Sequence, residues 1–145
     1  MDAFDADVLI YADDPSNPLR PRLLALFGGP HPVVGVGSVI LLPEVLSHVK
    51  RQGAPGQAAR LRRLLKRLDL RPVDRPTAEA ATTLGARYSL RAADAIHLAT
   101  ALQAGAARFI TNNRRDFKKS ISGIAVTYPD ELSEPRLPHS PGTST

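Results

Sequence analysis

Residues 4–12 read Phe-Asp-Ala-Asp-Val-Leu-Ile-Tyr-Ala, an acidic pair followed at once by an apolar run. The pattern predicts a short buried strand that ends near Asp5, followed by more strand or by a turn of helix, since periodicity cannot separate the two in so short a run. A carboxylate at the end of a buried strand is costly unless it is solvated, paired or bound to a metal. The presence of Asp5 and Asp7 at this place therefore needs an explanation.

The composition is that of one ordinary globular domain. The chain has 145 residues, of which 43% are hydrophobic and 23% are charged. It has no cysteine, which excludes disulfides, thiolate catalysis and Cys-based zinc sites, and its four histidines form no close ligand pair. The acidic N-terminus and the short apolar runs indicate neither a secretory signal nor a membrane span, so we expect a cytoplasmic protein. The net charge of +5 favours anionic partners.

Strand and helix patterns alternate along the chain. Such alternation implies an α/β domain with a mostly parallel sheet and helices on both faces. We expect this domain to span residues 1–128, and a tail rich in Pro, Ser and Thr, residues 129–145, to be disordered. Further strands are predicted at 33–36, 70–73, 108–111 and 121–126, and helices at 19–27, 41–49, 61–68, 74–88 and 91–104.

Three later carboxylates could join the acidic pair: Glu44, Asp94 and Asp116. Asp5 and Asp116 follow predicted strands, and ligands of parallel sheets collect outside the carboxyl ends of the strands. Taken singly, each acid could instead cap a helix, stabilise a turn or face solvent. A cluster of these acids would be repulsive without a cation, and ligands that are oxygen only suit Mg²⁺ or Mn²⁺. The corresponding chemistry is phosphodiester hydrolysis.

The stretch from Val45 to Leu68 contains no acidic residue and many basic ones. Leucines repeat there at helical spacing, so the basic residues occupy the exposed face. That face could simply be solvated. It could also hold RNA, because an acidic centre repels a polyanion and needs a basic surface beside it. The candidate RNA-binding residues are Lys50, Arg51, Arg60, Arg63, Lys66 and Arg67.

Four motifs in this order resemble the PIN-domain ribonucleases, the PilT N-terminal-like fold of VapC-type toxins. They are Phe4-Asp5-Ala6-Asp7-Val8-Leu9, the segment 38–46 around Glu44, the helix 94–102 that begins Asp-Ala, and Thr111-Asn112-Asn113-Arg114-Arg115-Asp116-Phe117. The resemblance covers residues 2 to about 127. It implies a three-layer α/β/α domain with a mostly parallel central sheet.

The same resemblance implies a metal-dependent endoribonuclease, the toxin of a type II toxin–antitoxin pair, with Mg²⁺ or Mn²⁺ as cofactor. It implies an RNA substrate (tRNA, rRNA or mRNA), products with 5′-phosphate and 3′-hydroxyl ends, a small antitoxin that covers the site, and a homodimer. Catalytic and metal-binding roles fall on Asp5, Glu44, Asp94 and Asp116, with supporting roles for Asp7, Ser38, Thr111 and Asn113.

This chain departs from the family pattern at two positions. Position 7 is commonly Asn or Ser in the family, and many members have an acid where this chain has Asn113. These departures keep open a PIN-fold module without catalysis that binds RNA or a protein partner. A phosphatase with Asp5 as nucleophile in an Asp-x-Asp motif is a third reading, although no lysine stands clearly beside the late acid. His97 lies one turn beyond Asp94 and is either close to the site or satisfied by a neighbouring hydrogen bond.

Overall fold

A computed structural model of the chain describes residues 1–135. The described part contains strands and helices in alternation, followed by one short 3-10 helix. The strands are β1 (Asp2–Phe4), β2 (Gly35–Ser38), β3 (Leu68–Arg71), β4 (Arg108–Ile110) and β5 (Ala125–Thr127). The helices are α1 (Ala6–Asp13), α2 (Arg20–Ala25), α3 (Leu41–Arg51), α4 (Pro55–Leu65), α5 (Arg75–Tyr88), α6 (Ala92–Gln103) and the 3-10 helix η1 (Pro129–Glu131).

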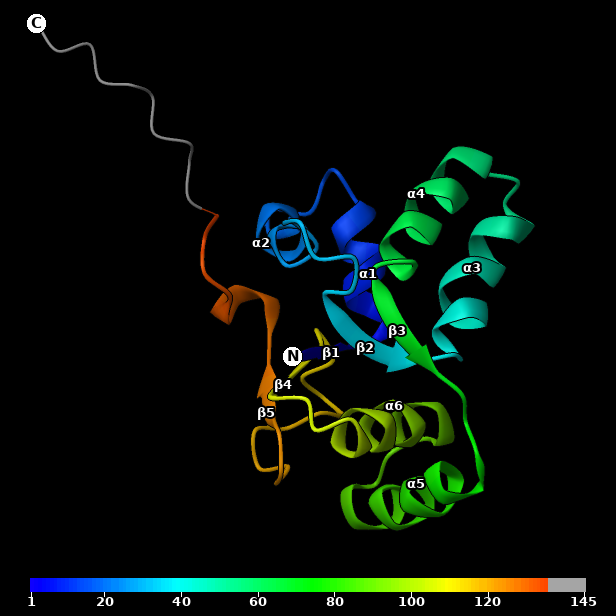
Figure 1. The fold of residues 1–145 in the computed structure, drawn as a ribbon, viewed down its shortest axis with the longest axis vertical. Helices are drawn as coiled ribbons and strands as arrows, with labels where there is room; N and C mark the ends of the chain where they lie inside the picture. The colour runs from blue at the N-terminus through cyan, green and yellow to red at the C-terminus, as the bar shows by residue number, and fades with distance from the viewer. Residues whose placement is uncertain (136–145) are drawn as a thin grey trace, which may run out of the picture.

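The strands form one sheet in the order β3-β2-β1-β4-β5, and every described pair is parallel. Helices α1 to α4 lie on one side of the sheet, and α5 and α6 lie on the other (Figure 1). This arrangement confirms the three-layer α/β/α fold. All carboxyl ends of the strands therefore point to the same edge of the sheet, where the candidate acids are expected.

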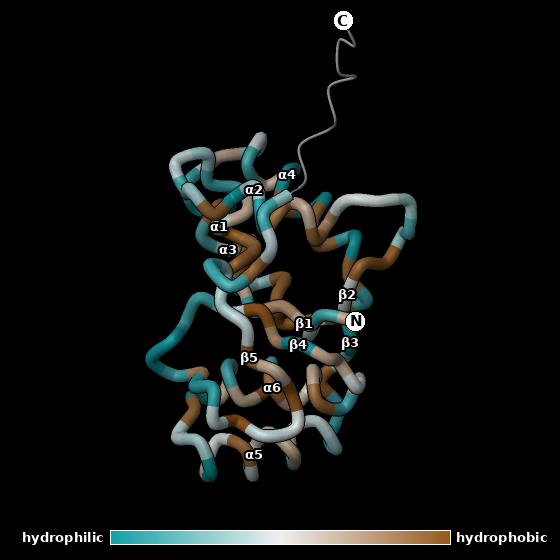
Figure 2. Tube along the Cα trace, turned by 90° about the vertical axis from the view of Figure 1, so that its left-hand side faces the viewer, coloured by the Kyte–Doolittle hydropathy of each residue, from teal (hydrophilic) through white to brown (hydrophobic). Residues whose placement is uncertain are grey.

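Successive residues of the central strands fill the two sides of the sheet in turn, as the pleat requires. Phe4 and Ile110 belong to the core under α1 to α4, whereas Ala3 and Phe109 belong to the core over α6. All four are buried. In Figure 2, hydrophobic stretches run through the middle of the molecule near the central strands, and hydrophilic stretches lie in outer loops. Such double burial explains why Ala3 and Phe4, and Phe109 and Ile110, are consecutive apolar residues.

The first strand ends at Phe4, and the rest of the opening stretch is helix α1. Asp5 has extended backbone angles, and its Oδ1 accepts a hydrogen bond of 2.8 Å from the Ala6 N–H. A carboxylate in this position stabilises the start of a helix. The sequence pattern did not distinguish strand from helix after Asp5. In the structure Asp5 caps a helix, so the segment that follows is helical.

Strand β2 lies two residues later than the predicted strand at 33–36. Val33 is 48% exposed, although its β-branched side chain favours a strand. The paired segment instead contains Gly35, because the sheet is too tight there for a side chain. A Cβ atom on Gly35 would lie 2.6 Å from the Asp2 carbonyl oxygen and 2.6 Å from the Phe4 ring.

The basic stretch forms two helices, α3 and α4, with Gly53 at a φ of +64° between them. Helix α3 begins at Leu41, so Pro43 lies in its first turn, where proline is tolerated. Ser38 is not the capping residue. The edge strand β3 begins and ends two residues earlier than the strand predicted at 70–73. Asp74 caps α5, because its side chain accepts from the Thr77 N–H at 2.9 Å.

Residues 129–135 pack against the domain beyond the boundary expected at residue 128. Leu132 is 4% exposed and belongs to the core under α1 to α4. Arg22 of α2 donates to the carbonyl oxygens of Asp130 and Leu132 at 2.9 and 3.1 Å. The remainder of the expected tail, 136–145, lies outside the described residues. Within residues 1–135, every helix is too short or too polar to cross a bilayer.

Candidate active site

Four acids from four separate segments lie towards the carboxyl edge of the sheet, close enough for three of them to act electrostatically on Asp94. Asp5 follows β1, Glu44 lies in the first turn of α3, Asp94 lies in the first turn of α6, and Asp116 lies in the loop after β4. Their charges act on one another: Asp5, Asp116 and Glu44 each contribute to raising the pKa of Asp94. The four main candidates thus form one electrostatic cluster.

Asp5 is the buried centre of this cluster, with 5% of its surface exposed. Its Oδ2 accepts a hydrogen bond of 2.8 Å from the Thr111 hydroxyl, and its Oδ1 accepts from the Ala6 N–H. Burial raises the pKa of Asp5, while His97 and the two hydrogen bonds oppose this effect. Asp5 is therefore held in one orientation, in an environment that disfavours its negative charge.

Asp7 fastens helix α1 to the loop after β4. Its two carboxylate oxygens accept from the Asn112 N–H at 3.3 and 3.1 Å. Burial, and then the charge of Asp5, raise the pKa of Asp7 to about 7. The extra negative charge at this position is thus poorly compensated in the protein alone.

Asp94 lies at the rim of the cluster and is partly exposed. Desolvation, followed by repulsion from Asp5 and Asp116, raises its pKa to about 6. Its place in the first turn of α6 favours the charged form through the helix dipole. Desolvation and the neighbouring carboxylates together outweigh that benefit.

Glu44 contacts a residue for which the sequence left two readings. The His97 Nε2 and the Glu44 Oε1 lie 3.2 Å apart, and the His97 side chain is fully buried. The His97 Nδ1 is buried and has no hydrogen-bond partner within the described residues. His97 is therefore both close to the site and hydrogen-bonded to a neighbour, because its Nε2 contacts Glu44. Its separation of three residues from Asp94, in an otherwise apolar helix, was the sequence signal.

Asn113 and Asp116 are joined by two hydrogen bonds. The Asn113 amide donates to Asp116 Oδ2 at 2.9 Å, and Asn113 Oδ1 accepts from the Asp116 N–H at 3.1 Å. The Thr111 hydroxyl, which donates to Asp5, also accepts from the Asn113 N–H at 3.1 Å. Thr111 thereby links the first acid to the loop that carries the last one.

The other supporting candidate, Ser38, forms no hydrogen bond to an acid among the described residues. Its hydroxyl accepts from the Ile40 N–H at 3.3 Å and so stabilises the turn between β2 and α3. Its effect on the site is confined to the position at which α3, with Glu44, begins.

Several of the candidate RNA-binding residues are engaged by protein oxygens or lie away from the acids. Arg60 is paired with the buried Asp13 at 2.6 Å, and Arg67 donates to the Gly29 carbonyl oxygen at 3.2 Å. Lys66 and Arg67 come directly before β3, which places them at the amino edge of the sheet, opposite the acids. Lys50 lines an apolar groove between α3 and α4. The leucine spacing identified their exposed face correctly but carried no information on its position relative to the site.

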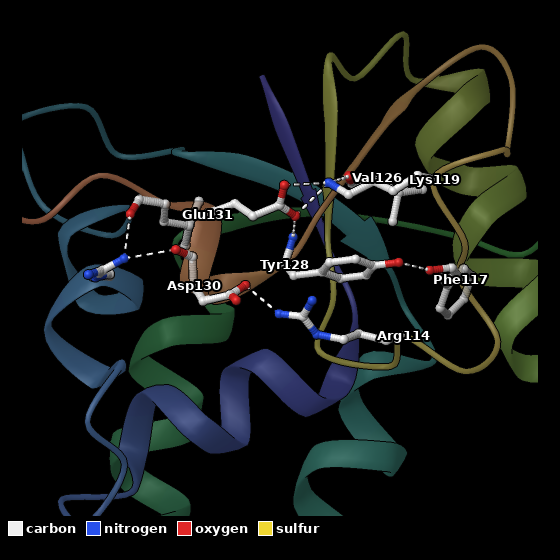
Figure 3. A network of polar contacts seen from close by, with 9 residues as sticks. Arg114, Phe117, Lys119, Val126, Tyr128, Asp130 and Glu131 are labelled. Atoms are coloured by element: carbon white, nitrogen blue, oxygen red, sulfur yellow. Dashed lines mark hydrogen bonds and ion pairs between the residues drawn. The ribbon is translucent and has the colours of Figure 1, made fainter.

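The loop after β4 is held from outside by a network of polar contacts (Figure 3). Tyr128 donates to the Phe117 carbonyl oxygen at 2.6 Å, and its ring lies between the charges of Arg114 and Lys119. Arg114 in turn pairs with Asp130, and Lys119 pairs with Glu131 at 2.7 Å. The network fixes the segment that positions Asn113 and Asp116.

The residues of the cluster fit a hard divalent cation by their donor chemistry. They supply carboxylate oxygens, the ligands that Mg²⁺ and Mn²⁺ prefer, and a cation would offset the burial and the repulsion that together raise the pKa values of Asp5 and Asp94. Within residues 1–135, however, no three His, Asp or Glu side chains are arranged so that they could hold an ion as they stand. The fit therefore rests on charge and donor type.

Comparison with known proteins agrees with this geometry. Ribonuclease VapC47 of Mycobacterium tuberculosis (strain CDC 1551 / Oshkosh) is 47% identical over 60 residues, which cover 41% of this chain and 43% of that protein. A chain in a solved toxin–antitoxin complex from Klebsiella pneumoniae is 28% identical, with a TM-score of 0.70, and the match covers 91% of this chain and 100% of that one. The PIN domain family model matches residues 4–120. Because that match spans most of the chain and includes all four acids, the chain belongs to the PIN domain family.

Proposed function

We propose that this protein is a Mg²⁺- or Mn²⁺-dependent endoribonuclease and acts as the toxin of a type II toxin–antitoxin pair. The observation that carries the proposal is the electrostatic cluster of Asp5, Glu44, Asp94 and Asp116 at the carboxyl edge of a parallel sheet. Such a cluster is costly to fold unless a cation offsets it. The names of a ribonuclease and of a toxin–antitoxin complex among the similar proteins support the same activity.

In this proposal the four acids hold the ion, which activates water and neutralises charge on the phosphate when bound. Thr111 orients Asp5 through its hydroxyl, and His97 orients Glu44. Orientation of ligands by hydrogen bonds of this kind commonly raises metal affinity. Asn113 holds the Asp116 carboxylate at the rim.

The proposal includes partners for the toxin. RNA is the substrate, a small antitoxin blocks the site, and the protein forms a homodimer in the cytoplasm. The Klebsiella pneumoniae chain, whose structure was solved in a toxin–antitoxin complex, supports the antitoxin.

The test is cleavage of a mixed tRNA and rRNA pool by the protein free of antitoxin, with Mg²⁺ or Mn²⁺ and with EDTA. We expect cleavage that depends on the metal and falls by about 100-fold or more in Asp5→Asn and in Asp94→Asn, since each removes a ligand charge. Asp69→Asn is the matched control, because Asp69 is an exposed acid of β3. Metal-induced thermal stabilisation that is lost in the same two variants is the second readout.

A PIN-fold module without catalysis is the alternative. It is favoured by the amide at Asn113 and by the spread of the acids, which do not form a ready metal site within residues 1–135. RNA binding without cleavage by a folded, metal-loaded protein would overturn the nuclease and establish this module.

A further inference from the structure

A second basic surface lies beside the acids, in a pocket between the end of α5 and the loop after β4. The pocket has a volume of about 470 Å³, which is within the range of small-molecule sites. Three cations, a tyrosine, two serines and one acid of the cluster line it. The residues that matter for the argument are Arg87, Tyr88, Arg115, Asp116 and Lys118.

The three cations of the pocket have no acidic partner. Arg87, Arg115 and Lys118 are exposed, and none forms an ion pair with any acid in residues 1–135. The Arg87 guanidinium lies 5.2 Å from the centre of the Tyr88 ring. Three uncompensated positive charges around one hollow attract a polyanion.

The loop after β4 separates its basic residues into two groups. Arg114 and Lys119 are neutralised by Asp130 and Glu131 on the η1 side, as Figure 3 shows. Arg115 and Lys118, which lie between them in the sequence, line the pocket instead. The free positive charge of this loop is thus confined to the side that faces α5.

The pocket shares one wall with the candidate active site. Asp116 lines the pocket and also belongs to the acidic cluster, where its charge acts on Asp94. An anionic chain held by the three cations would therefore run directly to the acids.

We propose that this pocket binds the sugar–phosphate backbone of single-stranded RNA next to the bond that is cut, with Arg87, Arg115 and Lys118 as phosphate contacts. Tyr88 offers a partly exposed ring against which a base can stack. This inference rests on the proposed nuclease function and adds the path of its substrate.

The groove between α3 and α4 is less suited to RNA. Its volume is about 380 Å³, and it is lined mainly by apolar residues such as Leu46, Val49 and Ala58. The groove is lined by two cations, Lys50 and Arg62, and by no acid of the cluster, whereas the pocket beside Asp116 has three cations. The pocket beside Asp116 is therefore the better candidate for an RNA-binding site.

The experiment measures binding of a labelled single-stranded RNA in EDTA, where metal-dependent cleavage is suppressed, over a range of salt concentrations. We expect Arg87→Gln and Arg115→Gln each to raise Kd and each to lower the slope of log Kd against log salt by about 0.7, one phosphate contact for a single strand. Together they should lower the slope by about 1.4. Arg75→Gln, at the other end of α5 and 90% exposed at its side chain, is the control and should change neither value.

The rival surface is tested with Arg63→Gln combined with Lys66→Gln on and after α4. Weaker RNA binding in this pair, with intact binding in the pocket variants, overturns our proposal. Unchanged thermal unfolding of all variants shows that binding, not folding, is measured.

Two outcomes separate this proposal from the nuclease. If the pocket variants lose RNA binding but the intact protein cuts no RNA, the RNA-binding pocket is confirmed and the nuclease is wrong. If the intact protein cuts RNA and the pocket variants have an unchanged KM, the nuclease is confirmed and the RNA-binding role of the pocket is wrong.

Discussion

Asp7 places a second carboxylate close to the buried Asp5, and the structure shows the consequence. Burial and the charge of Asp5 raise its pKa from an ordinary value of 3.8 to about 7. The native protein therefore keeps a proton that the unfolded chain releases between these two values. The folded state accommodates protonated Asp7 better than charged Asp7. The free energy of unfolding is therefore highest, as far as Asp7 is concerned, below about pH 4, and it falls as the pH rises through 7.

Asp7→Asn should therefore stabilise the metal-free protein at pH 8, by on the order of 3 kcal/mol, and change it little at pH 4. The amide oxygen of Asn can still accept from the Asn112 N–H. Urea unfolding in EDTA at the two pH values measures the difference, with Asp69→Asn as an exposed control. A variant that is less stable than the intact protein at pH 8 would show that the charge of Asp7 is compensated after all.

Strand β2 is the element whose position depends on the absence of side chains. Gly35 packs against the Asp2 carbonyl oxygen and the Phe4 ring, so β2 can approach β1 only without a Cβ atom there. Asp5 directly follows β1, and α3 with Glu44 follows β2. The spacing of these two strands therefore sets the distance between two of the acids.

Gly35→Ala should destabilise the protein by about 1–3 kcal/mol, because a methyl group overpacks this contact. Gly56→Ala in α4 is the matched control. A Cβ atom on Gly56 would meet only the end of the Arg60 side chain at 3.6 Å, so the change should stabilise the helix by about 0.5–1 kcal/mol. Thermal and urea unfolding of both variants compare the two glycines, and equal effects would contradict the role assigned to Gly35.

At the scale of the whole molecule, the segment after β5 closes the domain. Leu132 fills the core under α1 to α4, while Asp130 and Glu131 neutralise the cations that hold the loop after β4. Residues at the end of the described chain thus support a loop that carries the last acid of the site.

A chain that ends at residue 128 should accordingly be less stable than one that ends at residue 135. Burial of the Leu132 side chain alone contributes about 1.5–3 kcal/mol. Thermal unfolding of the two chains measures the loss, and Leu132→Ala in the longer chain should reproduce part of it. Identical unfolding of both chains would place the domain boundary back at residue 128.

The sequence determined the fold class and supplied the candidate acids of the proposed site. Alternating strand and helix patterns predicted the α/β layers, the Asp74 cap and the apolar composition of α6 predicted two helices, and Asp94 stood out because its helix leaves few polar positions. These features follow from local propensities and periodicity, which act within one or two turns of the chain.

Only the tertiary structure decided which groups meet. The position of β2, the burial of Leu132, the bond between His97 and Glu44, and the free cations beside Asp116 all depend on contacts between segments far apart in sequence. The sequence around a charged residue looks the same whether its side chain faces solvent, a buried acid or a pocket. Its partner is set by the packing of the layers, because electrostatic and packing energies depend on distances in space rather than along the chain.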